Sequence, residues 1–288
     1  MKDQSFLESD WDYCLVLDAC RYDVFSDVYD EYLRGSLEKR RSNGSSTPEW
    51  AYRTFTGEHD IAYFSGNPFI NDLDIPLNEL KWGASCDYEW TAADHISDVF
   101  DVWKTNWDDD LGTIPPGNIA DAFRKHRHAD ERTERTVLHY MQPHAPYIAR
   151  GKGQKLHKIQ KGIRKQDEAE AGGDDGGSML DTVRPKLEST LESSEFMQKA
   201  GLWLELDPAS IVQNGTREAA MALYEENLRI VLESVAELVP ELDGTVVVTA
   251  DHGEAFGEEG VWEHHIETHI PPLVEVPWLE VESAAPHG

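Results

Sequence analysis

The chain has 288 residues, of which 40% are apolar and 28% are charged, enough for one large α/β domain or two small ones. Aspartate and glutamate number 55 against 26 lysines and arginines, which gives a net charge of −29. This charge argues against non-specific binding to nucleic acid. It is typical of a salt-adapted (halophilic) organism; the alternative, an acidic interaction protein, fits less well because the acids are spread along the chain.

The cysteines and the N-terminal residues bear on the compartment. Cys14, Cys20 and Cys86 are odd in number and form no CxxC pair, which favours a reducing environment without a disulfide framework. The first 13 residues, MKDQSFLESDWDY, lack the apolar core of a signal peptide, and no stretch approaches the ~18 apolar residues of a membrane span. We therefore expect a cytoplasmic protein without a transmembrane segment.

Short apolar runs predict the strands. The segment DYCLVLDACRYD (residues 12–23) opens with one that ends at Asp18. The segments DIAYFSGNP (residues 60–68) and RTVLHYMQPHAPY (residues 135–147) predict two more, the second of them stopped by Pro143. GTVVV (residues 244–248) predicts a fourth, directly before Asp251 and His252.

Helices are predicted between these strands. Thr47 followed by Pro48 is typical of a helix start, with Thr47 as the N-cap and Pro48 at the first helical position. This helix would turn Trp50, Ala51 and Phe55 inward. Residues 214–239 carry the clearest helical stripe, which consists of Met221, Tyr224, Leu228, Val231, Leu232, Val235 and Leu238. Alternating strands and helices predict the α/β class, with a mostly parallel central sheet between two helical layers.

One segment differs in charge from the rest of the chain. Residues 149–166 hold seven lysines or arginines and no acid, and DEAEAGGDDGG (residues 167–177) follows them. The composition predicts a basic, glycine-rich insertion over residues 149–177, within a single domain that spans residues 1–288. At the rim of an active site its lysines would attract an anionic substrate; the alternative is a solvated loop without such a role.

Chemically reactive residues gather where the predicted strands end. Asp18 ends the first strand, His144 follows the third, and Asp251 with His252 follows the last. In parallel sheets, ligands bind beyond the carboxyl ends of the strands. Carboxylate with imidazole is a common ligand set for Zn²⁺ or Mn²⁺, whereas carboxylates alone favour Mg²⁺ or Ca²⁺. A single Asp-His pair can also be an incidental surface or capping pair; its place after a buried strand favours a divalent metal site.

Three further motifs stand out, which are TADHGEAFGEEG (residues 249–260) with the EHH that follows, LVEVPW (residues 273–278) and MQPHAPY (residues 141–147). Together they resemble the sulfatase branch of the alkaline phosphatase superfamily. The resemblance runs from Asp18 to Trp278, although residues 84–129 match nothing in it. It implies a three-layer α/β/α sandwich and metal-assisted attack on a sulfate or phosphate ester, with Asp18, Asp251 and His252 as metal ligands.

The nucleophile departs from the sulfatase pattern. Sulfatases require a C/S-x-P-x-R motif for conversion to formylglycine, and the chain has none. Thr47 is the better candidate, because related phosphodiesterases and transferases use threonine and because a helix N-terminus favours an anionic ester. The alternative for Thr47 is a purely capping role. The neighbouring Ser46 is an alternative nucleophile if the helix starts one residue earlier, and Cys20 is a weaker third candidate.

The remaining site residues follow from the same resemblance. His144 corresponds to a histidine that contacts the substrate or protonates the leaving group; its alternative is a structural role between two prolines. His264 would contact the sulfuryl or phosphoryl oxygens, while His265 is left open between substrate and metal. Arg21 could bind an ester oxygen bidentately, or could pair with one of the many carboxylates.

These observations predict a metal-dependent hydrolase or transferase of phosphate or sulfate esters with a threonine nucleophile. The missing formylglycine motif favours phosphate esters, on a small-molecule, glycan or lipid substrate that is anionic. The alternative is a catalytically degenerate relative that binds an anionic glycan or lipid headgroup without turnover. A serine hydrolase is disfavoured because no G-x-S-x-G elbow occurs.

Overall fold

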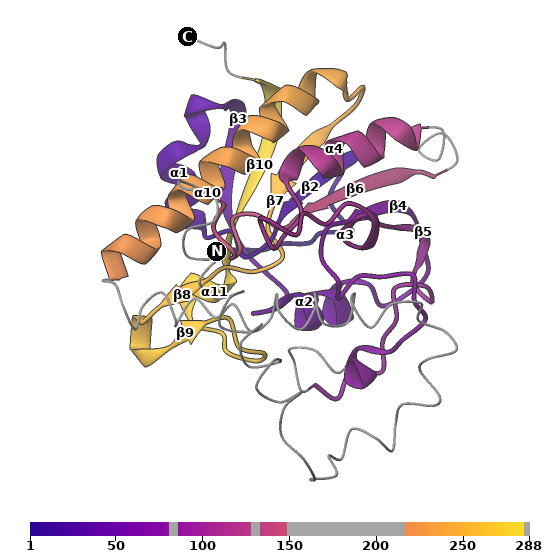
Figure 1. The fold of residues 1–288 in the computed structure, drawn as a ribbon, viewed down its shortest axis with the longest axis horizontal. Helices are drawn as coiled ribbons and strands as arrows, with labels where there is room; N and C mark the ends of the chain where they lie inside the picture. Colours follow the sequence, from indigo (N-terminus) through magenta and orange to yellow (C-terminus); the bar gives the residue numbers. More distant parts are fainter. Residues whose placement is uncertain (81–85, 128–132, 149–216, 285–288) are drawn as a thin grey trace, which may run out of the picture.

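The computed structural model describes residues 1–80, 86–127, 133–148 and 217–284. Its centre is a sheet that has eight strands within these ranges, in the order β1-β3-β10-β7-β2-β6-β4-β5 (Figure 1). The strands are β1 (Lys2–Asp3), β2 (Tyr13–Leu17), β3 (Leu33–Arg41), β4 (His59–Ser65), β5 (Ile96–Asp101), β6 (Arg135–Tyr140), β7 (Val246–Thr249) and β10 (Glu275–Ala284). A separate hairpin pairs β8 (Ala255–Phe256) with β9 (Trp262–Glu263).

The central sheet is mostly parallel. Strands β7, β2, β6, β4 and β5 run in one direction, and β10 lies antiparallel between β7 and β3. Strand β2 is buried at all five positions because helices cover both faces of the sheet. The predicted strands before Asp18 and Asp251, and those over residues 60–68 and 135–147, are confirmed as β2, β7, β4 and β6.

Helices lie on both sides of the sheet. Helices α1 (Tyr22–Val28), α4 (Pro116–Lys125) and α10 (Arg217–Leu238) lie together on one face, where Phe123 of α4 packs edge-on against Tyr13 and Phe64 (Figure 1). Helix α2 (Thr47–Thr54) covers the other face through Trp50, which contacts His139 of β6. The short helices are α3 (Val102–Thr105) and α11 (Pro271–Val274), with 3₁₀ turns at Tyr29–Glu31, Leu77–Glu79, Val239–Glu241 and Glu258–Gly260.

The two predicted helices are confirmed, with one shift in register. Ser46 rather than Thr47 is the N-cap residue of α2, so Thr47 is the first helical residue and Pro48 the second. Ser46 has extended backbone angles, φ −159° and ψ 160°. Trp50, Ala51 and Phe55 are buried as expected, and so are the stripe residues of α10 apart from Met221, which is partly buried.

The other strands of the described ranges were not predicted, namely β1, β3, β5 and β10 of the central sheet and the hairpin strands β8 and β9. β3 has the sequence LRGSLEKRR, in which charged residues hide the short apolar pattern. Its pairing with β10 over nine residue pairs makes it a strand. The predicted basic insertion, residues 149–177, lies outside the described residues. None of the helices in the described ranges is both long and apolar enough to cross a membrane.

Candidate active site

The loops that follow four neighbouring parallel strands meet at one edge of the sheet. Strands β7, β2, β6 and β4 are adjacent and parallel, so their carboxyl ends point the same way. Asp18 follows β2, Asn67 follows β4, His144 follows β6, and Asp251 follows β7. The structure therefore brings together residues that are more than 200 positions apart in the sequence.

Thr47 lies at the centre of this group. Its hydroxyl oxygen is 2.7 Å from Asp251 Oδ2 and accepts a hydrogen bond from Asn67 Nδ2 at 3.0 Å. The Nε2 atom of His252 is 3.4 Å away. By contrast, the hydroxyl of neighbouring Ser46 is buried without a hydrogen-bond partner among the described residues. The helix does start one residue earlier than predicted, which was the condition that favoured Ser46, but the hydroxyl that contacts the predicted metal ligands is that of Thr47.

Asp18, Asp251 and His252 converge as the sequence predicted. His252 Nε2 lies 3.5 Å from Asp18 Oδ1 and 3.4 Å from Asp251 Oδ2. All three side chains are buried. Asn67 Nδ2 donates to Asp18 Oδ2 at 2.7 Å, and Asn67 Oδ1 accepts from the backbone N–H of Phe69, which determines the orientation of the amide.

The His252 ring directs a lone pair at the two carboxylates. Its Nδ1–H donates to the carbonyl oxygen of Gly253 at 2.7 Å, so a neutral ring has no proton on Nε2. Burial is the main cause that lowers the pKa of His252 well below its usual value, and repulsion by the nearby His264 adds to it. Both keep the ring neutral. A lone pair and carboxylate oxygens at 3.4–3.5 Å repel one another, and a cation among them would turn the repulsion into coordination.

Asp18 gives the same indication. Its Oδ1 atom is buried and has no hydrogen-bond partner among the described residues. Burial, and then the charge of Asp251, raises the pKa of Asp18 well above its usual value. A divalent cation would balance the negative charges of Asp18 and Asp251 and would give the Oδ1 atom of Asp18 a partner. The residues present therefore fit a divalent metal, with Asp18, Asp251, His252 and the hydroxyl of Thr47 as the potential ligands.

His139 lies beneath this group, in the interior of β6. Its Nδ1 atom is 2.7 Å from the hydroxyl oxygen of Tyr63, and its Nε2 atom is 3.8 Å from Asp251 Oδ2. One ligand atom each from Asp18, His139 and Asp251 lies within 4.8 Å of the others, so His139 could complete the metal's coordination. Burial lowers the pKa of His139 to about 4, which keeps it neutral and able to bind a metal.

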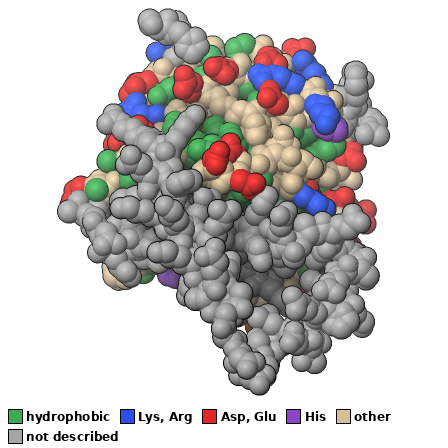
Figure 2. Space-filling view, in the orientation of Figure 1, with side chains coloured by type: hydrophobic (Ala, Val, Ile, Leu, Met, Phe, Trp, Pro, Cys, Tyr) green, Lys and Arg blue, Asp and Glu red, His purple; other side chains and the backbone are tan. Residues whose placement is uncertain are grey.

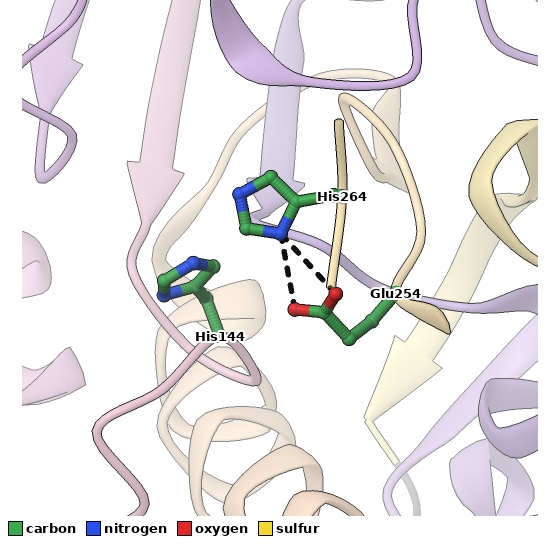
Figure 3. A group of neighbouring side chains, drawn as sticks. All are labelled: His144, Glu254 and His264. Atoms are coloured by element: carbon green, nitrogen blue, oxygen red, sulfur yellow. Dashed lines mark hydrogen bonds and ion pairs between the residues drawn. The ribbon is translucent and has the colours of Figure 1, made fainter. Parts of the chain in front are cut away.

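A second group, formed by His144, Glu254 and His264, adjoins the first (Figure 3). His264 Nδ1 lies 3.1 and 3.2 Å from the two carboxylate oxygens of Glu254. The His264 ring is 4.9 Å from the His144 ring and 4.6 Å from the His252 ring, between centroids. Ligand atoms of the three residues lie within 4.8 Å of one another, so this group could hold a second cation or the oxygens of a substrate.

The two histidines of this group differ in protonation. Burial lowers the pKa of His264, but the Glu254 carboxylate outweighs burial and raises the pKa above its usual value. Burial, and then repulsion by His264, lowers the pKa of His144 to about 4. His264 therefore binds a proton more readily than His144 does. His144 is neutral, and its Nδ1–H donates to the carbonyl oxygen of Ala145.

Asn227 holds the loop that carries His144. This residue is buried in α10, and its side-chain amide donates to the carbonyl oxygens of Pro143 and His144 at 3.1 and 3.0 Å. Its carbonyl oxygen accepts from the backbone N–H of Ile148. The helix predicted from the stripe at residues 214–239 thus positions one of the candidate catalytic side chains.

Of the two roles considered for Arg21, binding of an ester oxygen and pairing with carboxylates, the structure shows the second. Its guanidinium contacts Asp23 at 2.6 Å and Glu258 at 2.8 Å, and it also donates to the carbonyl oxygen of Glu254. The side chain is only 6% exposed. It therefore supports the segment that carries Glu254, and four of its five donors are directed at protein groups. Cys20 is buried, with a pKa raised by burial, which disfavours a thiolate nucleophile.

Sequence reasoning missed Asn67, His139 and Glu254. The reasoning that selected Asp18, a polar residue at the end of a predicted strand, would have selected Asn67 as well. His139 is a polar residue inside an otherwise apolar strand, where a buried group needs a reason. Glu254 was part of the recognised DHGE motif without a role of its own. His265, by contrast, is exposed, and its carbonyl oxygen rather than its ring makes the contact with Ser45.

Known structures share this fold. The soluble domain of lipooligosaccharide phosphoethanolamine transferase A from Neisseria meningitidis matches 94% of this chain and 75% of its own, with a TM-score of 0.50 and 12% identity. The integral membrane protein of the same name matches 94% of this chain, with a TM-score of 0.52 and 13% identity, and the chain spans 47% of its length. No family model matches the sequence, and no curated protein does either. The likeness confirms the alkaline-phosphatase-like fold that the motifs implied.

Proposed function

We propose that this chain is a metal-dependent phosphoryl transferase or hydrolase with Thr47 as its nucleophile. The observation that carries the proposal is the arrangement around Thr47. A neutral imidazole lone pair and two buried carboxylates converge beside its hydroxyl, although they repel one another without a cation. The fold is compatible, because two solved structures that share it are named as phosphoethanolamine transferases.

The metal would be held by Asp18, Asp251 and His252, with His139 close enough to add a further nitrogen. The mixed carboxylate and imidazole set favours Zn²⁺ or Mn²⁺ over Mg²⁺ or Ca²⁺. A bound dication supplies two things here, a lower pKa for the Thr47 hydroxyl and polarisation of the ester oxygens. The remaining chemistry belongs to the side chains.

Thr47 is arranged for attack. Its hydroxyl hydrogen points at Asp251 Oδ2, 2.7 Å away, and Asn67 Nδ2 holds the oxygen in place at 3.0 Å. In the first step the Thr47 oxygen, which has released its proton to solvent, bonds to phosphorus, and the ester bond breaks as His264 gives a proton to the leaving oxygen. The backbone N–H groups at the start of α2 face the same region and favour the negative charge of the phosphoryl group.

His264 fits the role of proton donor better than His144. The Glu254 carboxylate raises the pKa of His264 above its usual value, whereas burial lowers the pKa of His144 to about 4, so His264 binds a proton more readily. Because the Nδ1–H of His264 is directed at Glu254, its Nε2–H remains for the leaving oxygen. In the second step, water or an acceptor alcohol attacks phosphorus, returns a proton to His264 and releases Thr47.

Phosphate esters fit this residue set better than sulfate esters. A threonine sulfate has no easy route to release, whereas a phosphothreonine can pass its phosphoryl group to water or to an alcohol. Water as acceptor gives a hydrolase and an alcohol gives a transferase. We propose an anionic small-molecule, glycan or lipid ester as the substrate class.

Turnover of a p-nitrophenyl phosphodiester, monoester and sulfate, with metal analysis of the purified protein, tests this proposal. Thr47→Ala should lower turnover by at least ~10³-fold without loss of bound metal, because the nucleophile is removed. Thr47→Ser should retain part of the activity. EDTA should abolish turnover, and Zn²⁺ or Mn²⁺ should restore it.

Ser46→Ala is the matched control, since it removes the adjacent buried hydroxyl, which has no hydrogen-bond partner among the described residues. It should leave turnover unchanged; a large loss in Ser46→Ala with an active Thr47→Ala would transfer the nucleophilic role to Ser46. Mass spectrometry of a rapidly quenched reaction should find phosphate on the peptide that contains Thr47. Metal and ligand binding without any turnover would instead favour a catalytically degenerate binding protein.

A further inference from the structure

Glu49 is a fully buried carboxylate two residues beyond Thr47, on the first turns of α2. It lies outside both metal-competent groups of the candidate active site. Its Oε2 atom accepts from the backbone N–H and the hydroxyl of Ser45, at 2.9 and 2.7 Å, and from the backbone N–H of Glu267 at 3.0 Å. Its Oε1 atom contacts His269 Nε2 at 2.7 Å and Arg53 at 2.9 Å.

Two of these donors belong to the segment that carries His264. We define residues 263–270 as the histidine loop. Ser45 adds two contacts to it, because its hydroxyl oxygen accepts from the backbone N–H of Thr268 at 3.0 Å and lies 2.8 Å from the carbonyl oxygen of His265. Glu49 and Ser45 together therefore hold the loop at His265, Glu267, Thr268 and His269.

Apolar packing contributes little to holding this loop. Every residue from 263 to 270 is partly or fully exposed, and His265, Glu267 and His269 belong to the exposed class. The loop joins the hairpin β8–β9 to α11, and its backbone has a positive φ at Glu263 and Glu267. A segment without buried side chains takes its position from its hydrogen bonds, and several of these end on Glu49 of α2 and on Ser45, which lies just before that helix.

We propose that Glu49 is a positioning residue that locks the histidine loop to the nucleophile helix, and so sets the place of His264 relative to Thr47. The His264 ring is held on one side by Glu254, and its loop is held on the other side by Glu49 and Ser45. Removal of the second contact leaves the loop free to shift. A displacement of ~1 Å in a catalytic group can cost about 100-fold in rate. The kinetic part of this inference rests on the proposed function, but the structural part does not.

Hydrogen exchange tests the structural part without any substrate. Glu49→Gln replaces one carboxylate oxygen by an NH₂ group, which cannot accept from the N–H donors that surround Glu49. Peptides that cover residues 263–270 should exchange faster in this variant, by at least ~10-fold at the amides of Glu267 and Thr268. Arg53→Gln is the matched control, because it removes a partner of Glu49 that is 41% exposed and lies on α2 itself; its loop should exchange as in the wild type.

A double-mutant cycle tests the kinetic part. Glu49→Gln should lower kcat/KM by ~10- to 100-fold with unchanged metal content, the range typical of residues that orient a site from behind. In a His264→Ala background the same substitution should change kcat/KM by less than about twofold, because the group it positions is gone. An effect through general destabilisation would be the same in both backgrounds, and that result would overturn the proposal.

Three further outcomes of these experiments bear on the role of Glu49. Unchanged exchange of the histidine loop in Glu49→Gln would overturn the proposal whatever the kinetics show. If the wild type has no ester-cleaving activity, the proposed function fails, while faster exchange would still support Glu49 as the lock of the loop. If Glu49→Gln does not fold, Ser45→Ala takes its place, since it removes the contacts to Thr268 and His265 and leaves the Glu49 carboxylate intact.

Discussion

The side-chain amide of Asn67 contacts both a proposed metal ligand and the proposed nucleophile. Its Nδ2 atom donates both to Asp18 and to Thr47, a proposed metal ligand and the proposed nucleophile. Its Oδ1 atom is engaged by the backbone N–H of Phe69, so the amide cannot rotate without loss of a hydrogen bond. The side chain is fully buried, and its loss would leave a carboxylate oxygen without a donor.

Asn67→Ala should therefore lower both metal affinity and turnover by ~10- to 100-fold, the usual effect of an orienting partner of a metal ligand. Metal titration and kcat on a phosphodiester measure the two effects. Asn43→Ala is the control, since Asn43 also donates its amide within this region, but to Thr54 at the far end of α2. Equal losses in both variants would show that Asn67 contributes to the helix rather than to the site.

His139 connects the site to the pH dependence of stability. Burial depresses its folded-state pKa to about 4, below the ~6.5 of an unfolded histidine. Between these values the unfolded chain binds a proton at this position and the folded chain does not. Stability is therefore lost as pH falls from about 6.5 to 4, by up to ~1.4 kcal/mol per pH unit from this residue alone.

His139→Gln should remove that share of the pH dependence. Urea unfolding at several pH values between 7 and 4.5, with a chelator present so that metal loss does not contribute, compares the variant with the wild type. The stability of the variant should fall less steeply with decreasing pH. Parallel curves for the two proteins would contradict a buried, neutral His139.

At the scale of elements, a close approach between two segments explains the glycine of the DHGE motif. Gly253 donates its N–H to the carbonyl oxygen of Leu273, in α11. A Cβ atom at Gly253 would lie 2.0 Å from the backbone oxygen of Pro272. This contact places the loop after β7 against α11, directly beyond the proposed ligands Asp251 and His252.

Gly253→Ala should consequently shift α11 or the metal ligands, with a loss of roughly 1–3 kcal/mol in the free energy of unfolding and weaker metal binding. Gly117→Ala is the control, because a Cβ there has no atom within 4 Å and the residue lies in α4. That change should be neutral or stabilising by up to ~1 kcal/mol. Similar unfolding curves for the two variants would show that α11 yields to the added methyl group at little cost.

At the scale of the whole molecule, the excess of acids dominates. The net charge is −29, and on the described part of the face in Figure 2 the acids are scattered rather than gathered in one patch. The many surface carboxylates repel one another in dilute buffer. Salt screens them, since the Debye length falls from ~10 Å at 0.1 M to ~3 Å at 1 M.

We expect the unfolding temperature to rise steadily between 0.1 and about 2 M KCl, as it would in a protein adapted to high salt. Differential scanning fluorimetry measures the change. Sucrose at matched osmolality is the control, because it strengthens burial without screening charge. An equal rise in sucrose would assign the effect to solvent exclusion, and no rise in KCl would contradict the role of charge repulsion.

The sequence by itself determined the elements whose signals are local. The apolar runs of β2, β4, β6 and β7, the stripe of α10 and the Thr-Pro start of α2 follow from neighbouring residues, and each of these elements is present. Strand ends followed by Asp18, Asp251 and His252 were visible for the same reason. In a parallel sheet the carboxyl ends share one edge, so the convergence of these residues follows from topology.

Only the tertiary structure decided which further side chains join them. β3 and β10 are strands because they pair with each other across more than 200 residues of sequence, and no local pattern records such a pairing. Asn67, Glu254 and Glu49 are ordinary polar residues in the sequence, and their roles follow from burial and from partners on other elements. Folding also separates the pKa values of two histidines, because the Glu254 carboxylate raises that of His264 while desolvation lowers that of His144. Those environments exist only after the chain has folded.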